Sequence, residues 1–344
     1  MIQANPLLQV DAAAVRAEIG QDALLGLYRK MLLIRRFEEQ AEKQSGFFRE
    51  GTTIKKIAGF LHLYIGQEAV QTGFYAHLDP AKDATVTSYR CHALALLAGE
   101  PPKELMAELY GKGTGNVAGK GGSMHFFSKK NNVLGGHGIV GGQIPVGIGA
   151  AFSAKYRKSG GVSVSFLGDG ASPQGTFHES LNMAALWKLP VVFAVVNNQY
   201  GMGTRVDRAS ACLRFVERAE TFGVRGVQVD GMDVEAVYQA SDELFAWSRA
   251  GNGPAFLIGD CYRYYGHGRK DPSPYRDKSE EESWRKKDPI DAQKRRLSEA
   301  GLCDEEAFAA ITKEIGGEMD AAVAWASAGQ LPVPEDLFTG VYAD

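Results

Sequence analysis

Two short apolar runs in the middle of the chain have the pattern of buried β-strands. They cover residues 162–167 and 191–196 and are rich in valine and phenylalanine. Between them, apolar residues from Phe177 to Ala185 recur at helical spacing. A strand, a helix and a second strand form a βαβ unit, whose strands are parallel and whose crossover is right-handed. We therefore expect both strands to end at the same edge of a sheet.

Further segments continue this alternation of strands and helices. The other expected strands are residues 84–88, 224–229 and 255–258, and the expected helices are 11–45, 66–77, 101–109, 144–157, 233–250 and 290–328. Segments 46–60 and 263–290 are expected to be loops, the second of them exposed, and the glycine-rich stretch 111–143 is expected to be ordered. The pattern predicts an α/β fold with a mostly parallel sheet flanked by helices.

Composition narrows the class of protein. The 344 residues suffice for a large core, and we expect an N-terminal extension (1–20), one large domain (21–330) and a C-terminal tail (331–344). A net charge of −3 gives no reason to expect nucleic acid or an anionic membrane as a partner. The four cysteines form no CxxC pair, and no apolar run approaches the ~18 residues that span a bilayer. We expect a reducing, cytoplasmic location.

Polar motifs follow four of the expected strands. Gly168-Asp169-Gly170 and Asn197-Asn198 end the two central runs, and SYRCH (88–92) and YYGH (264–267) follow two others. Ligands of open parallel sheets bind where such strand ends meet. A carboxylate and an amide oxygen suit Mg²⁺ or Ca²⁺, with phosphate oxygens completing the shell. The alternative is that the aspartate only caps a helix.

In this order and spacing, the motifs resemble the thiamine diphosphate-dependent 2-oxo acid dehydrogenase E1 α family. The similarity covers roughly residues 25–290 and includes GFLHLYIGQEA, GKGGSMHFF, GGHGIVGGQIPVG and VDGMD. It implies a thiamine diphosphate-binding fold, decarboxylation of a 2-oxo acid and transfer of the acyl group to a lipoyl group. NNQYGMGT and GHGIVGGQIP are closer to the pyruvate type than to the branched-chain or acetoin types.

The resemblance also implies roles for individual residues. The Mg²⁺ ligands would be Asp169, Asn198 and the backbone carbonyl of Tyr200. The residues that would bind thiamine diphosphate are Tyr89, Arg90, Gly138, Val140, Asp169, Gly170, Ala171, Asn198, Tyr200 and His267. His267 is the first catalytic candidate, followed by His62 and His92, of which His92 could equally be a packing residue.

The resemblance implies partner proteins as well. Such enzymes need a glutamate facing the cofactor's aminopyrimidine nitrogen, and the family supplies it from a separate β subunit. Glu68 is a candidate within this chain, but we expect an inactive single chain that works in an α₂β₂ heterotetramer with a lipoylated E2 acyltransferase.

Three other functions remain open. Within the family, the substrate could be acetoin or a branched-chain 2-oxo acid. From another class, the chain could be a metal-dependent phosphohydrolase that uses Asp169, or a non-enzymatic assembly or binding subunit.

Overall fold

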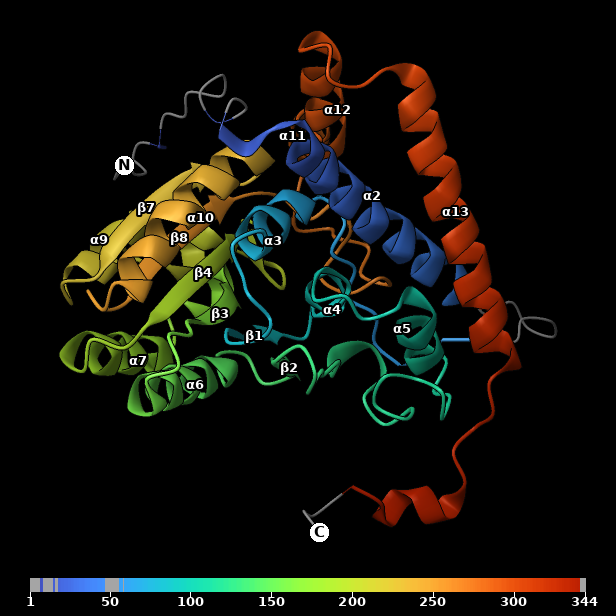
Figure 1. Cartoon of the computed structure of the whole chain (residues 1–344), viewed down its shortest axis with the longest axis horizontal. Coiled ribbons are helices and arrows are strands. Elements are labelled where there is room, and N and C mark those ends of the chain that lie inside the picture. Colours follow the sequence, from blue (N-terminus) through green and yellow to red (C-terminus); the bar gives the residue numbers. More distant parts are fainter. Residues whose placement is uncertain (1–6, 9–14, 16–17, 47–55, 58, 341–344) are drawn as a thin grey trace.

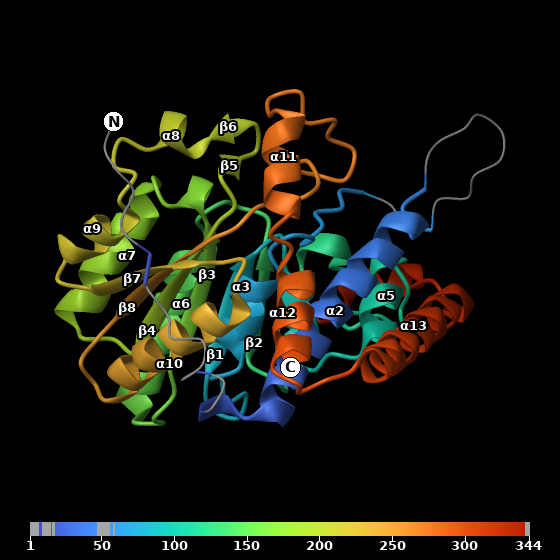
Figure 2. The same ribbon diagram turned by 90° about the horizontal axis from the view of Figure 1, so that it is seen from above.

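Six parallel strands form the central sheet, and helices cover both of its faces (Figures 1 and 2). The computed structural model describes residues 7–8, 15, 18–46, 56–57 and 59–340. The strands are β1 (Ala84–Ser88), β2 (Val133–His137), β3 (Ser163–Gly168), β4 (Val191–Asn197), β7 (Arg225–Asp230) and β8 (Ala255–Asp260), in the spatial order β2-β1-β3-β4-β8-β7. The predicted α/β fold with a mostly parallel sheet is confirmed.

The two central strands pair as their sequence pattern predicts. β3 and β4 are parallel neighbours, with Ser163 opposite Val191 and Gly168 opposite Val196. Alternate residues along β3 belong to different cores, because Phe166 packs with the cluster on one face and Leu167 with the cluster on the other. The chain therefore leaves both strands at the same edge of the sheet, where the GDG motif and the NN pair follow directly.

The helices form two layers around the sheet. On one face lie α6 (Gln143–Arg157), α7 (Gly175–Leu186) and α9 (Phe215–Glu220). On the other lie α3 (Glu68–Tyr75) and α10 (Val234–Arg249), with α2 (Gln21–Gln44) packed outside α3. Among the described residues, the other α-helices are α4 (His92–Leu97), α5 (Pro102–Leu109), α8 (Val206–Ala209), α11 (Lys278–Arg285), α12 (Pro289–Glu299) and α13 (Glu305–Ala328).

The helix expected over 290–328 is in fact two helices, α12 and α13. An aspartate caps each: Asp288 Oδ1 accepts from the Ile290 N–H at 2.9 Å, and Asp304 Oδ1 accepts from the Ala307 N–H at 2.8 Å. An N-cap residue has non-helical backbone angles, so the second cap ends any continuous helix. Gly301, with a φ of 67°, lies between the two helices, where the left-handed backbone favours glycine.

Strand β2 lies within the glycine-rich stretch, where the sequence predicted no strand. A Cβ added at Gly136 would lie 2.6 Å from the Cys91 sulfur, and Gly135 has a φ of 100°. Close packing and a left-handed backbone therefore require glycine at these two positions. Glycine lowers strand propensity, which hides the strand from a pattern-based prediction.

Two expected segments lie largely outside the described residues: the loop over 46–60 and the start of the helix over 11–45. In the part of the chain that the structure describes, no helix is both long and apolar enough to cross a membrane.

Candidate functional site

A cavity of about 740 Å³ opens at the carboxyl edge of the sheet. Residues that follow β1, β3, β4 and β8 line it, including Arg90, Asp169, Asn198 and His267. These are the four strands that the polar motifs were predicted to follow, and they are consecutive in the sheet. The volume lies within the range of small-molecule and cofactor sites.

Several buried oxygen atoms of the cavity lining have no partner within the described residues, and two of them belong to the strand-end motifs. The first is Oδ2 of Asp169, a residue that is only 2% exposed. The second is Oδ1 of Asn198, whose Nδ2 donates to Gln67 Oε1 at 2.8 Å. Buried polar atoms are normally satisfied, so the pair indicates a ligand. Hard oxygen donors of this kind fit a divalent cation such as Mg²⁺.

The buried position of Asp169 shifts the pKa of its carboxyl group. Burial raises the pKa of the Asp169 carboxyl to about 6, against the opposing effects of Arg263 and of backbone N–H groups at Gly170 and Asn198. A bound divalent cation would favour the ionised carboxylate, because metal ligands must be deprotonated.

A close approach of two turns shapes the floor of the cavity. A Cβ added at Gly170 would lie 2.9 Å from the Gly201 Cα, so glycine is needed where the turn after β3 meets the hairpin of β5 (Tyr200–Gly201) and β6 (Thr204–Arg205). The Tyr200 carbonyl already accepts from Arg263 Nη1 at 2.7 Å. A carbonyl oxygen has two lone pairs, so one remains for a cation.

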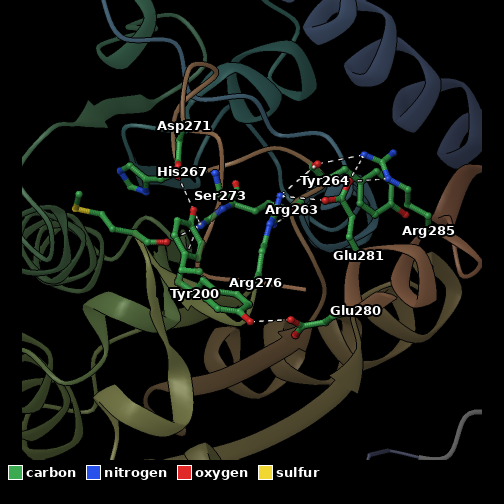
Figure 3. Close-up of polar contacts among 12 residues, drawn as sticks. Tyr200, Arg263, Tyr264, His267, Asp271, Ser273, Arg276, Glu280, Glu281 and Arg285 are labelled. Atoms are coloured by element: carbon green, nitrogen blue, oxygen red, sulfur yellow. Dashed lines mark hydrogen bonds and ion pairs between the residues drawn. The ribbon is translucent and has the colours of Figure 1, made fainter. Parts of the chain in front are cut away.

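Arg263 organises the segment after β8, which Figure 3 shows. Its guanidinium is buried and donates to the carbonyls of Tyr200 and Met202 at 2.7 and 2.6 Å. Arg276 in turn donates to the Arg263 carbonyl at 2.7 Å, and α11 follows. The prediction of an exposed loop over 263–290 was wrong for this part, because its arginines turn inward to satisfy backbone carbonyls.

Three rings gather at one wall of the cavity. The His62 ring centroid lies 4.5 Å from that of Tyr89 and 5.1 Å from that of His267. Burial, reinforced by the nearby Arg90 charge, lowers the pKa of His62 to about 3 and that of His267 to about 4. Both imidazoles are therefore neutral near pH 7, and each can hold or accept a proton at a ring nitrogen.

His92 lies away from this wall and does not line the cavity. It is fully buried, with Nδ1 2.9 Å from Glu38 Oε2 and Nε2 3.0 Å from Ser123 Oγ. Its placement favours the packing role over the catalytic one, the two alternatives that the sequence left open. Helix α4 begins at His92 and turns it into the core, although Tyr89 and Arg90 of the same motif face the cavity.

The other predicted cofactor residues also line the cavity, namely Gly138, Val140, Gly170, Ala171 and Tyr200. Sequence reasoning assigned no role to Gln67, which orients Asn198, or to Arg263. Gln67 lies within the GQEA motif, so the sequence drew attention to this segment but did not predict the contact of Gln67 with Asn198.

The charged residues in the described lining are Arg90, Arg263 and Asp169. Two cations and one anion leave the cavity one positive charge in excess, which favours an anionic ligand. Glu68 is not part of this lining, because its Oε1 accepts from Arg35 at 2.5 Å and its Oε2 from the Gly66 N–H at 2.9 Å.

Comparison with known proteins agrees with this geometry. Residues 29–335 match the model of the family described as "Dehydrogenase E1 component". The chain is 44% identical over 327 residues to the pyruvate dehydrogenase E1 component subunit alpha of Zymomonas mobilis, covering 95% of this chain and 90% of the relative. It is 43% identical over 330 residues to the mitochondrial type II subunit alpha of Ascaris suum, covering 95% and 81%. The chain therefore belongs to the dehydrogenase E1 component family.

Proposed function

We propose that this chain is the α subunit of a pyruvate dehydrogenase E1 component, which decarboxylates pyruvate with thiamine diphosphate and acetylates a lipoyl group of E2. The observation that carries the proposal is the convergence of four strand-end motifs on two unpartnered buried oxygens, those of Asp169 and Asn198. The names of the relatives support pyruvate as the substrate. Thiamine diphosphate would supply the carbon nucleophile and take up the electrons.

The residues of the cavity suit a metal-bound diphosphate. Asp169, Asn198 and the Tyr200 carbonyl would hold Mg²⁺, which adds two charges to the single excess positive charge. The negative charges of a diphosphate ester near pH 7 would offset this positive charge. Arg90 uses two N–H groups on the carbonyls of Leu63 and His267, which leaves others for phosphate oxygens.

The remaining residues would place the rest of the cofactor and the reacting group. Tyr89, Gly170, Ala171 and His267 would contact the diphosphate, and the backbones at Gly138 and Val140 would hold the aminopyrimidine ring. His62 and His267 are neutral and buried, so either could hold a proton near the reacting carbon.

The missing carboxylate supports a partner subunit. The described lining of the cavity contains no glutamate. At Val140 and the start of α6, the cavity borders an exposed apolar surface. That surface begins at Val140 and at Val146 of α6, which are 40% and 39% exposed, and continues along α6 away from the cavity to Phe152 and Tyr156, which are 49% and 81% exposed. Exposed apolar surfaces of this kind are typical of subunit contacts. We propose that a β subunit docks there in an α₂β₂ heterotetramer and supplies the glutamate.

Gln67→Leu is expected to raise the Mg²⁺ concentration for half-maximal cofactor binding by about tenfold. Leucine removes the acceptor that fixes the Asn198 amide, so Asn198 Oδ1 no longer faces the cation consistently. Fluorescence titration of the α–β complex with thiamine diphosphate, over a Mg²⁺ series, measures the shift. Gln71→Leu is the matched control, since Gln71 also lines the cavity and its Oε1 has no described partner. An equal shift in both variants would contradict the role of Gln67.

A substrate panel tests the proposed function. With β chain, Mg²⁺, thiamine diphosphate and a lipoyl acceptor, we expect kcat/KM for pyruvate to exceed that for 3-methyl-2-oxobutanoate and acetoin by at least about tenfold. The two extra methyl groups of 3-methyl-2-oxobutanoate are worth that much in a fitted pocket, and acetoin lacks the carboxylate. Preference for either competitor would assign the chain to the branched-chain or acetoin branch of the family instead. Phosphatase activity without decarboxylation would overturn the proposal.

A further inference from the structure

Glu38 of helix α2 is a carboxylate that is buried outside the cavity. It is fully buried and does not belong to the described lining. Its Oε1 accepts from the Tyr64 N–H at 2.9 Å, and its Oε2 accepts from His92 Nδ1 at 2.9 Å. A buried carboxylate is costly unless it is hydrogen-bonded, so both contacts help to hold Glu38 in place. Helix α2 packs against α4, which brings these segments together (Figure 1).

The first contact couples Glu38 to Arg90 through a single peptide group. The N–H of that group belongs to Tyr64 and donates to Glu38. Its carbonyl belongs to Leu63 and accepts from Arg90 Nη1 at 2.8 Å. Hydrogen bonds in such a chain polarise one another, so the carboxylate makes the carbonyl a stronger acceptor. Burial lowers the pKa of the Arg90 guanidinium to about 10, and the negative charge of Glu38 acts in the opposite direction. The same carboxylate therefore orients Arg90 and stabilises its charge.

The second contact fixes the backbone that carries Arg90. His92 lies two residues after Arg90, at the first position of α4. Its other ring nitrogen, Nε2, lies 3.0 Å from both the carbonyl oxygen and the hydroxyl oxygen of Ser123, so it has a partner whether or not it carries a proton. Ser123 directly precedes Met124, which lines the cavity. Glu38 is therefore tied to the guanidinium of Arg90, to its backbone and to a further segment of the cavity wall.

Ser123, His92 and Glu38 are connected in the order of a hydrolytic triad. Their burial argues against that role, because Ser123 is only 7% exposed and none of the three residues lines the cavity. A ligand in the cavity would not reach the hydroxyl. The cluster can therefore act on the site only by positioning the residues that do line it.

We propose that Glu38 is a positioning residue for diphosphate binding, which holds Arg90 so that its free N–H groups face the phosphate oxygens. This inference rests on the proposed function, because it takes thiamine diphosphate as the ligand of Arg90. Two N–H groups of the guanidinium already donate to the carbonyls of Leu63 and His267, at 2.8 and 2.6 Å. The remaining N–H groups have a defined direction only while these carbonyls stay in place, and Glu38 holds the peptide group of the first.

A double-mutant cycle in the α–β complex tests this role, with thiamine diphosphate as the probe at saturating Mg²⁺ and fluorescence titration as the measurement. Glu38→Gln removes the charge but keeps the shape of the side chain. Its amide can still donate to His92 Nδ1, because His92 Nε2 can then donate to the Ser123 carbonyl. We expect Glu38→Gln to weaken binding at least about fivefold in the wild-type background and less than about twofold in the Arg90→Gln background, because residues that act through one another are not additive.

Glu100→Gln is the matched control. Glu100 is another buried glutamate, which accepts from Ser128 Oγ at 2.5 Å and from Asn131 Nδ2 at 2.9 Å and does not line the cavity. Its replacement should leave the affinity for thiamine diphosphate within about twofold of wild type, because a buried carboxylate without contact to the site affects stability rather than binding.

Glu38→Asp is the second variant if Glu38→Gln does not fold. It keeps the charge but withdraws the carboxylate by one methylene group, and the same dependence on Arg90 is expected. An equal loss of affinity in both backgrounds, or no loss in either, would overturn the role of Glu38 and leave the proposed function intact. If Arg90→Gln alone left the affinity unchanged, Glu38 would have no clamp to position and the inference would fail as well. A wild-type complex that binds no thiamine diphosphate would overturn the proposed function itself.

Discussion

The purified chain, supplied with Mg²⁺, thiamine diphosphate and pyruvate, is expected to show no turnover without a β chain. The described cavity holds the groups for a metal and a diphosphate but no glutamate, since Asp169 is its only described carboxylate. The family resemblance implies that a carboxylate facing the aminopyrimidine promotes formation of the nucleophilic carbon, so we expect its absence to abolish turnover. Pyruvate-dependent reduction of an artificial electron acceptor measures turnover directly, without requiring E2.

Adding the β chain should restore turnover, with activity saturating at one β chain per α chain. Glu68→Gln provides a control for the competing assignment. The Arg35 and Gly66 contacts hold Glu68 outside the cavity lining, so its loss is expected to affect stability more than kcat per assembled complex. Turnover by the chain alone, abolished by Glu68→Gln, would contradict the account.

Asp169→Asn is expected to lower kcat/KM of the α–β complex by at least about 100-fold, since it removes the one charged ligand of the proposed cation. Asparagine has nearly the same shape, so the fold should survive. Burial raises the pKa of Asp169 to about 6, which means that the metal-free fold disfavours the ionised carboxylate. Near pH 7 and without metal, the variant should therefore melt at the same temperature as wild type or higher.

Asp260→Asn is the matched control. Asp260 is another largely buried carboxylate at a strand end, but it accepts from Asn197 and Gln228 and does not line the cavity. Its replacement should leave the Mg²⁺ dependence of activity unchanged. If Asp169→Asn retained wild-type Mg²⁺ dependence, the metal assignment would be wrong.

Local pattern was enough to predict the part of the fold that positions the site. The apolar runs of β3 and β4 and the helical spacing between them define a βαβ unit, and general rules for such units place Asp169 beside Asn198. The same reasoning placed Tyr89, Arg90 and His267 at that edge, since each follows a strand that the apolar pattern marks.

Contacts between distant segments could not be predicted in this way. Gln67 meets Asn198 across 131 positions of sequence, and Arg263 meets the Tyr200 carbonyl across 63. The direction of His92 depends on a Glu38 carboxylate 54 positions away. Periodicity indicates which face of an element is buried, but it does not identify the polar group that a buried side chain will contact.

Calorimetric titration of the α–β complex with thiamine diphosphate tests the central claim most directly, because it measures cofactor binding separately from turnover. The account predicts one site per α chain at saturating Mg²⁺ and affinity at least about tenfold weaker in EDTA, since Asp169 and Asn198 would hold a cation that offsets the charge of the diphosphate. Asp169→Asn should bind with the weaker affinity under both conditions. Equal affinity of the wild-type complex with and without Mg²⁺, or no binding at all, would contradict it.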